Sequence, residues 1–181
     1  SHMIAVFPGQ QIHPTTTPEF AEAAIVSLVA RGAGRTGWSK VWRSLCYARL
    51  LVADKAYSRI NDLVANKTYG NLWMTHPPFQ IDANFGFAAA VNEMLVQSHT
   101  GKIHLLPALP DAWPTGRVRG MRVRGGFELD MQWRDGRLLS VEVRNVANPD
   151  GQCDLFYNGT KITRKVLPGR PLTLTADAFA R

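Results

Sequence analysis

A short proline-rich segment, residues 75–86 (THPPFQIDANFG), gathers side chains that can do acid–base and hydrogen-bonding chemistry. They are one imidazole, one carboxylate and two amides: His76, Asp82, Gln80 and Asn84. Two prolines follow His76, and because proline fixes φ and disfavours helix at the residue before it, we expect His76 to be held extended. Polar groups on a stiff loop that leads into an apolar helix are typical of sugar-processing sites.

The same residues also have a purely structural interpretation. Asp82 or Asn84 is well placed to cap the helix that follows, since a short side-chain oxygen can accept the unpaired N–H groups of a first turn. Those N–H groups would also stabilise an ionised carboxylate. Asp82 would then be better suited to act as a base than as an acid, so the two interpretations are compatible. His76 could equally be an ordinary loop histidine.

Length and composition indicate a globular chain of one domain or two small ones. The chain has 181 residues, 45% of them hydrophobic and 19% charged. These values are ordinary for a globular protein that can bury a core. No apolar run approaches the roughly 20 residues that span a bilayer, so no membrane partner is expected. We interpret residues 1–3 as the remnant of a purification tag. The compartment is left open, and a secreted or periplasmic parent protein is compatible with it.

The net charge of +7 does not by itself predict a nucleic-acid partner. Its basic excess lies mostly in the second half, where four arginines alternate with other residues as in a strand: Arg117, Arg119, Arg122 and Arg124. Without interleaved aromatic residues to stack bases, they indicate a solvated sheet face. Cys46 and Cys153 have no metal-ligand spacing, so we expect two buried apolar thiols and no metal or cofactor.

The first half of the chain has helical periodicity. Thr17, as a hydroxyl N-cap before Pro18, predicts a helix that stops near Gly32. Further helices are predicted from about Trp38 to Val52, from near Asp54, and after Asp82. The last of these has little polar surface, so we expect it to be wrapped by other helices.

The second half switches to the period of a strand. Residues 127–133 alternate apolar and polar, and Asp135-Gly136 and Asn158-Gly159 each predict a hairpin turn. The fold class is therefore α+β. We expect a helical segment over residues 4–100 and a small antiparallel β-sheet or sandwich domain over residues 101–181.

Several blocks together resemble glycoside hydrolase family 95, which comprises α-L-fucosidases and some α-L-galactosidases. The blocks, in family order, are residues 7–12 (FPGQQI), 36–39 (TGWS), 48–51 (ARLL), 76–86 (HPPFQIDANFG) and 103–110 (IHLLPALP). The resemblance implies the last helices of an (α/α)6 barrel followed by a β domain. It also implies an inverting hydrolysis without a cofactor.

The resemblance assigns roles to several residues. Asp82 corresponds to the general base and His76 to a sugar-contacting histidine, whereas binding roles for Gln80 and Asn84 are less specific and Asn84 is more typical of a structural residue. Trp38 and Trp73 could stack on a sugar, but we favour buried packing for both. Ala83 stands where the family has glycine, and it would be strained if that position needed a positive φ.

The resemblance also implies that the family segments carrying the general acid and two water-positioning asparagines precede this chain. Glu93 lies too far along its helix to replace that acid. We therefore expect the 181 residues to be inactive alone, with a fucosylated glycan or related α-L-glycoside as the partner of the whole enzyme. Exposed helix walls predict a homo-oligomer or a complementing N-terminal segment. The alternative is a non-catalytic carbohydrate-binding or interaction module.

Overall fold

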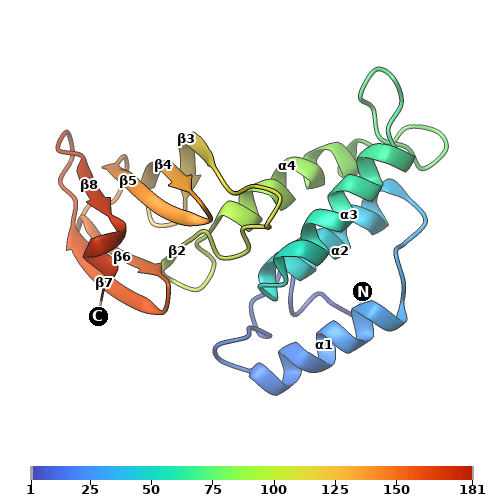
Figure 1. Cartoon of the computed structure of the whole chain (residues 1–181), viewed down its shortest axis with the longest axis horizontal. Coiled ribbons are helices and arrows are strands. Elements are labelled where there is room, and N and C mark those ends of the chain that lie inside the picture. The colour runs from blue at the N-terminus through green and yellow to red at the C-terminus, as the bar shows by residue number, and fades with distance from the viewer. Residues whose placement is uncertain (1, 181) are drawn as a thin grey trace. The chain divides into compact units, whose positions relative to one another are not determined.

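The computed structural model describes residues 2–180 and has an α+β fold, as the sequence predicts (Figure 1). Its contacts divide the chain into two compact units, and the boundary in the sequence lies between Leu95 and Val96. The first unit is helical and the second contains the strands. Among the described residues, no helix has the length and apolar character needed to cross a bilayer.

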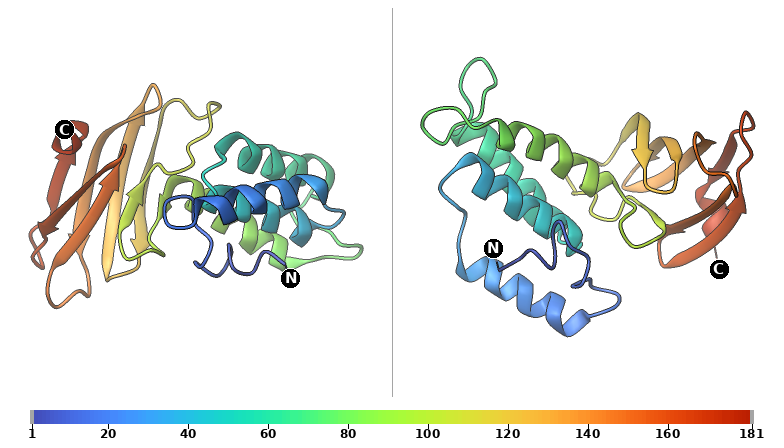
Figure 2. Two further views of the ribbon diagram at one scale, coloured as in Figure 1. Left: turned by 90° about the horizontal axis from the view of Figure 1, so that it is seen from below. Right: turned by 180° about the vertical axis from the view of Figure 1, so that it is seen from behind.

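The helical unit contains four helices. They are α1 (Pro18–Ala30), α2 (Gly37–Arg49), α3 (Ala53–Asn66) and α4 (Ile81–Leu95). Helix α2 packs against both α3 and α4, and Figure 2 shows these three lying side by side. Their apolar residues, spaced at three and four, close a small core between them, because helical side chains at these spacings share one face. Fully buried members of that core are Val41, Leu45, Leu63 and Met94.

The N-termini of α1 and α2 differ in capping: a side chain caps α2 but not α1. At α2, Thr36 Oγ1 accepts the Ser39 N–H at 3.3 Å, and Ser39 Oγ accepts the Thr36 N–H at 3.0 Å, which forms a capping box. At α1, Thr17 occupies the N-cap position, but its hydroxyl accepts the backbone N–H of His13 at 2.9 Å instead. The prediction that the Thr17 side chain caps α1 is therefore wrong, because the preceding turn competes for that oxygen.

Two ion pairs fasten α2 to its neighbours. The Arg49 guanidinium donates to both carboxylate oxygens of Glu93 on α4, at 2.6 and 2.8 Å. Lys40 pairs with Asp62 on α3, and both cations are buried. Because a buried cation is costly without a partner, removing either carboxylate would leave an uncompensated charge and destabilise the helical unit.

Helix α4 is not wrapped on all sides. It contacts α2 and α3, yet Phe85 is 71% exposed near its start. The expectation that α4 is enclosed by other helices is wrong for the described residues, since α2 and α3 cover one side of it. Other large apolar residues of this unit are also exposed, among them Phe20, Val26 and Leu72.

The second unit contains two four-stranded sheets. The first has the strand order β1-β2-β6-β7 and the second β3-β4-β5-β8. The bounds are β1 Val96–Gln97, β2 Ile103–Leu105, β3 Gly116–Val123, β4 Phe127–Arg134, β5 Arg137–Asn145, β6 Gln152–Tyr157, β7 Thr160–Lys165 and β8 Leu172–Thr175, followed by the 3₁₀ turn η1 Ala176–Phe179. All pairs are antiparallel except β2 with β6, which run parallel.

Both predicted hairpins are confirmed. Asp135-Gly136 joins β4 to β5 and Asn158-Gly159 joins β6 to β7, with positive φ at all four residues. Alternate residues of β4 point inward and are buried, as the period-two pattern predicts.

Both cysteines are buried and free, one in each unit. Burial raises the pKa of Cys46 and of Cys153 to about 12, so both thiols are protonated at neutral pH.

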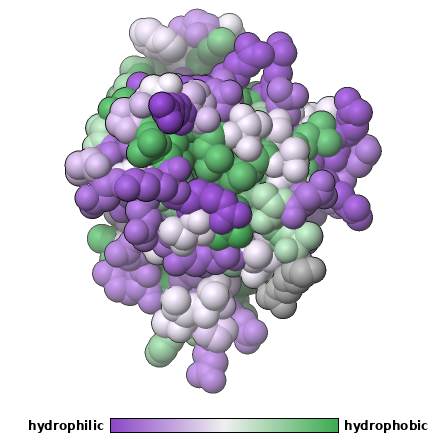
Figure 3. All heavy atoms as spheres, turned by 90° about the vertical axis from the view of Figure 1, so that its left-hand side faces the viewer, coloured by the Kyte–Doolittle hydropathy of each residue, from purple (hydrophilic) through white to green (hydrophobic). Residues whose placement is uncertain are grey.

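One face of the second unit carries mostly polar side chains (Figure 3). The side of the molecule shown in Figure 3 carries hydrophilic side chains around a smaller hydrophobic area. The four arginines on and just after β3 are exposed, and Arg122 pairs with Glu128 at 2.6 Å. A β-bulge between Val118 and Met121 shifts the register, which keeps the arginines outward on both sides of it. They form the solvated sheet face that the sequence predicts.

Candidate functional site

The loop between α3 and α4 is braced from within. Two isolated bridges, Thr68 with Met74 and Thr75 with Phe79, fold it back on itself. The Tyr69 hydroxyl lies 2.9 Å from Thr75 Oγ1, and that Oγ1 donates to the Pro78 carbonyl at 3.0 Å. Because these contacts join its two arms, the loop has a defined shape.

The two amides fasten this loop to the helices. Asn84 accepts the Met74 N–H at 3.1 Å through Oδ1 and donates through Nδ2 to the Leu72 carbonyl at 2.9 Å. Gln80 Oε1 accepts the Trp38 N–H at 2.9 Å at the start of α2. Both side chains are therefore occupied by backbone groups, which gives them a positioning role in this structure.

Asp82 lies in the first turn of α4, and its side chain is exposed. The helix begins at Ile81, so Asp82 follows the cap instead of forming it, and Asn84 lies inside the helix. The prediction that one of them caps α4 is therefore wrong. A carboxylate in a first helical turn is still stabilised by the positive end of the helix dipole. This leaves an accessible anion next to the braced loop.

Ala83 fits its position without strain. It is helical, has no positive φ and is fully buried. Its Cβ would lie 2.8 Å from a Cβ placed on Gly37, so the starts of α2 and α4 are in close contact here. The strain considered for alanine at this position does not arise, and Asp82 is not displaced by it.

His76 is exposed at the tip of the loop. Its N–H donates to the Pro78 carbonyl at 2.9 Å, across the cis Pro77–Pro78 bond. The prolines therefore hold its backbone in a tight turn, and the imidazole is accessible to solvent.

The aromatic residues are more exposed than the sequence predicts. Trp38 is 38% exposed and Trp73 is 52% exposed, so buried packing is the wrong description of both. Trp73 stacks on Phe79 with ring centroids 4.4 Å apart and an angle of 32° between the planes. Sequence reasoning missed Phe79, although it lies inside the motif, because its pairing with Trp73 depends on the fold of the loop.

Two other carboxylates of the helical unit, Glu93 and Asp62, each form an ion pair. Glu93 binds Arg49, and Asp62 binds Lys40, whose hydrogen bond is the main cause that lowers the pKa of Asp62. Within residues 2–180, no group of three or more His, Cys, Asp or Glu side chains could hold a metal ion.

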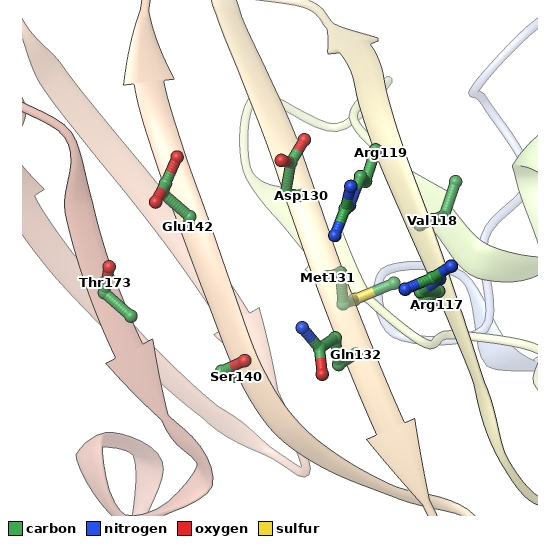
Figure 4. A pocket seen from close by; sticks show the side chains of 9 residues that line it. All are labelled: Arg117, Val118, Arg119, Asp130, Met131, Gln132, Ser140, Glu142 and Thr173. Atoms are coloured by element: carbon green, nitrogen blue, oxygen red, sulfur yellow. The ribbon is translucent and has the colours of Figure 1, made fainter.

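A polar hollow of about 250 Å³ lies on the outward face of β3, β4, β5 and β8 (Figure 4). Arginines from β3 face carboxylates from β4 and β5 across it: Arg117, Arg119, Asp130 and Glu142. Arg144 binds Asp130 and Glu128, and these hydrogen bonds lower the pKa of both carboxyl groups. No aromatic ring lines this hollow, so it lacks a surface for stacking on a sugar.

The chain thus combines a helical unit, with an exposed carboxylate in the first turn of α4, and a β unit that follows it. Residues 1–95 match the glycosyl hydrolase family 95 catalytic domain, and residues 97–170 match the glycoside hydrolase family 95 C-terminal domain. The chain belongs to glycoside hydrolase family 95, as the sequence resemblance indicates.

Two relatives show what this chain is similar to. It is 42% identical over 189 residues to Alpha-L-fucosidase 2 of Arabidopsis thaliana, a match that covers 98% of the chain and 22% of the relative. It is 36% identical over 159 residues to Probable alpha-fucosidase A of Aspergillus niger, which covers 77% of the chain and 20% of the relative. The chain therefore spans about a fifth of the length of the curated relatives that it matches.

Proposed function

We propose that this chain is the C-terminal part of an inverting α-L-fucosidase-like glycoside hydrolase, with Asp82 as its general base. The observation that carries the proposal is the exposed Asp82 carboxylate in the first turn of α4, beside a loop fixed by Gln80 and Asn84. Its relatives are named as fucosidases, which supports an α-L-fucoside as the substrate.

The base would act on water. In an inverting reaction the base removes a proton from a water molecule, which attacks the anomeric carbon while an acid protonates the leaving oxygen on the opposite face. The acid and base carboxyl groups stand about 6.5–9.5 Å apart to admit that water. The exposed Asp82 carboxylate, in the first turn of α4, would accept that proton. His76, accessible at the loop tip, would contact the sugar.

The general acid is not assigned to this chain. Glu93 and Asp62 each neutralise a buried cation, so neither can take up a catalytic proton without leaving that cation unpaired. We propose that the acid comes from another part of a longer enzyme, as the relatives' length and the family resemblance suggest. A general acid contributes about 10²–10⁴-fold to such a rate.

The first test uses the 181 residues alone. With nitrophenyl α-L-fucoside, we expect no turnover by the unchanged chain. The variants Glu22→Gln and Asp82→Asn should give the same background rate. Glu22 is an exposed carboxylate on α1 and serves as the control. Turnover that disappears in Asp82→Asn alone would show that the isolated chain already contains a complete site.

The second test supplies the rest of the enzyme. In a chimera, this chain replaces the matching segment of the Arabidopsis relative. We expect α-L-fucoside hydrolysis that falls about 10²–10⁴-fold in Asp82→Asn and not in Glu22→Gln. An active chimera that tolerates Asp82→Asn would refute the base assignment. Binding of a neutral α-L-fucoside by the isolated chain, with no active chimera, would instead support a carbohydrate-binding module.

A further inference from the structure

A second hollow, of about 530 Å³, lies in the helical unit between the N-terminal segment, the end of α1 and the start of α2. Its lining combines cationic and aromatic side chains, including Arg31, Arg43, Trp38 and Trp42, and contains no carboxylate. We call these four residues the arginine–tryptophan hollow. His2, which we interpret as part of the tag remnant, also lines it and meets Trp42 edge-on, with ring centroids 6.3 Å apart, so the proposed site consists of the arginines and tryptophans alone.

The positive charge in the hollow is not compensated. The Arg43 guanidinium donates to the Ser39 carbonyl at 2.7 Å and to the Arg31 carbonyl at 3.5 Å, while its Nε is buried without a partner among the described residues. Within residues 2–180 neither arginine forms an ion pair. Burial, and then the nearby charge of Arg31, lower the pKa of Arg43. Such a group gains from a bound anion, because charge-assisted hydrogen bonds to guanidinium are strong.

The tryptophans add a surface for a sugar ring. Trp42 Nε1 donates to the Phe7 carbonyl at 3.2 Å, which fixes the indole, and Trp38 is 38% exposed. Indole faces pack well against the C–H face of a pyranose, since both are apolar. A site with indoles and guanidinium groups therefore suits a ligand that is apolar on one face and anionic at its edge.

Trp38 connects the hollow to the proposed catalytic loop. Its backbone N–H binds Gln80 Oε1, and its Cζ3 lies 3.2 Å from where a Cβ on Gly86 of α4 would stand. Gln80 and Gly86 flank Asp82 in the sequence. The hollow is thus attached to the segment that carries the proposed base.

We propose that the arginine–tryptophan hollow binds a sugar ring that carries an oxyanion, either the carboxylate of a uronic acid or a sulfate ester. That this sugar belongs to the glycan bearing the scissile fucoside rests on the proposed function. The binding itself does not rest on it, because none of the four residues transfers a proton in the proposed reaction. The tryptophans contact the ring, and the two guanidinium groups hold the oxyanion.

Indole N–H signals of the ¹⁵N-labelled 181-residue chain test this binding. The signals of Trp38 and Trp42 are assigned with Trp38→Phe and Trp42→Phe, and Trp113 and Trp133 of the β unit serve as internal references. The probes are methyl glucuronide, galactose 6-sulfate, neutral methyl glucoside and sodium sulfate. We expect at least one of the two anionic sugars to shift the Trp38 and Trp42 signals, and the probe that does so identifies the oxyanion. The neutral sugar should shift neither.

Matched variants test the role of charge. Arg31→Gln should weaken anionic-sugar binding about tenfold, in keeping with the loss of a charge-assisted hydrogen bond. Arg35→Gln removes the same charge from a nearby exposed arginine that does not line the hollow, and it should change the affinity less than twofold. Arg31→Lys should restore part of the loss. Both arginines are exposed, so the fold is expected to survive either change.

The proposal is overturned by any of four results: no shift with either anionic sugar, equal binding of methyl glucoside, equal weakening by Arg31→Gln and Arg35→Gln, or sodium sulfate binding as tightly as the sugars. Asp82→Asn should leave the binding unchanged. If Asp82→Asn abolishes the activity of the chimera but leaves sugar binding intact, the hollow and the proposed base act independently. Either hypothesis can then fail without the other.

Discussion

Asn84 connects helix α4 to the loop before it through two backbone hydrogen bonds, to the Met74 N–H and the Leu72 carbonyl. A side chain used in this way fixes the distance between the loop tip and Asp82. A family motif alone does not distinguish this role from sugar binding, since an amide serves both equally well. The geometry favours the positioning role.

Asn84→Ala should therefore free the loop without unfolding the protein. We expect the Met74 amide to exchange with solvent at least about tenfold faster, because it loses its acceptor. Hydrogen exchange measured by NMR or mass spectrometry checks this. Asn61→Ala, at an exposed asparagine of α3, is the control and should leave Met74 unchanged. Unaltered exchange in Asn84→Ala would contradict the tether.

Asp62 makes the stability of the helical unit depend on pH. The Lys40 hydrogen bond holds the pKa of Asp62 below its ordinary value, so the native state binds fewer protons here than the unfolded chain. Its contribution is complete above the unfolded pKa of about 3.9 and is lost as pH falls through the lower native value. Urea titrations followed by helical circular dichroism should show this loss, and Asp62→Asn should reduce the dependence. An unchanged pH profile in that variant would show that other carboxylates dominate.

At the scale of the elements, the pair between Arg49 and Glu93 joins the end of α2 to the last turn of α4. The Arg49 side chain is 4% exposed and the Glu93 side chain 20%, so the guanidinium depends on this carboxylate for its compensation. The pair also explains why an arginine occupies a position in the apolar stripe of α2.

Glu93→Gln should destabilise the helical unit by about 2 kcal/mol, below the range for a fully buried pair because Glu93 is partly exposed. Urea unfolding measures this. Glu22→Gln on α1 removes an exposed carboxylate and should change stability by less than about 0.5 kcal/mol. Equal effects of the two substitutions would mean that Arg49 finds another acceptor.

Local signals in the sequence predict much of this architecture. The Asp135-Gly136 and Asn158-Gly159 turns need positive φ, which these residues tolerate, so the hairpins follow from four residues. Helix α1 begins at Pro18 as predicted, because proline lacks the N–H that would be unpaired there. Such features depend on neighbours in the chain.

The features that the sequence does not predict depend on distant contacts. Thr17 turns toward His13, and Trp73 meets Phe79 only when the loop folds. The parallel pairing of β2 with β6 joins segments about 50 residues apart. Arg31, just after α1, and Arg43, on α2, line the same hollow, and no motif in the sequence marks them.

At the scale of the whole molecule, the exposed apolar residues of the helical unit predict self-association. Phe85 and Leu72 are 71% and 73% exposed, and Phe20 is 65% exposed. We expect light scattering to show a dimer or larger species, and Phe85→Ser to shift it toward the monomer, because apolar patches of this kind seldom remain in water. Lys55→Ser on exposed α3 surface is the control. A strictly monomeric chain would contradict this expectation.

The two buried thiols give each unit its own chemical reporter. Cys46 belongs to the helical unit and Cys153 to the β unit, and their exposed fractions are 0% and 1%. A maleimide can react with either sulfur only after the surrounding unit opens, and the raised pKa suppresses the reactive thiolate until then. Peptide mapping after brief labelling in rising urea would therefore reveal which half of the chain opens first.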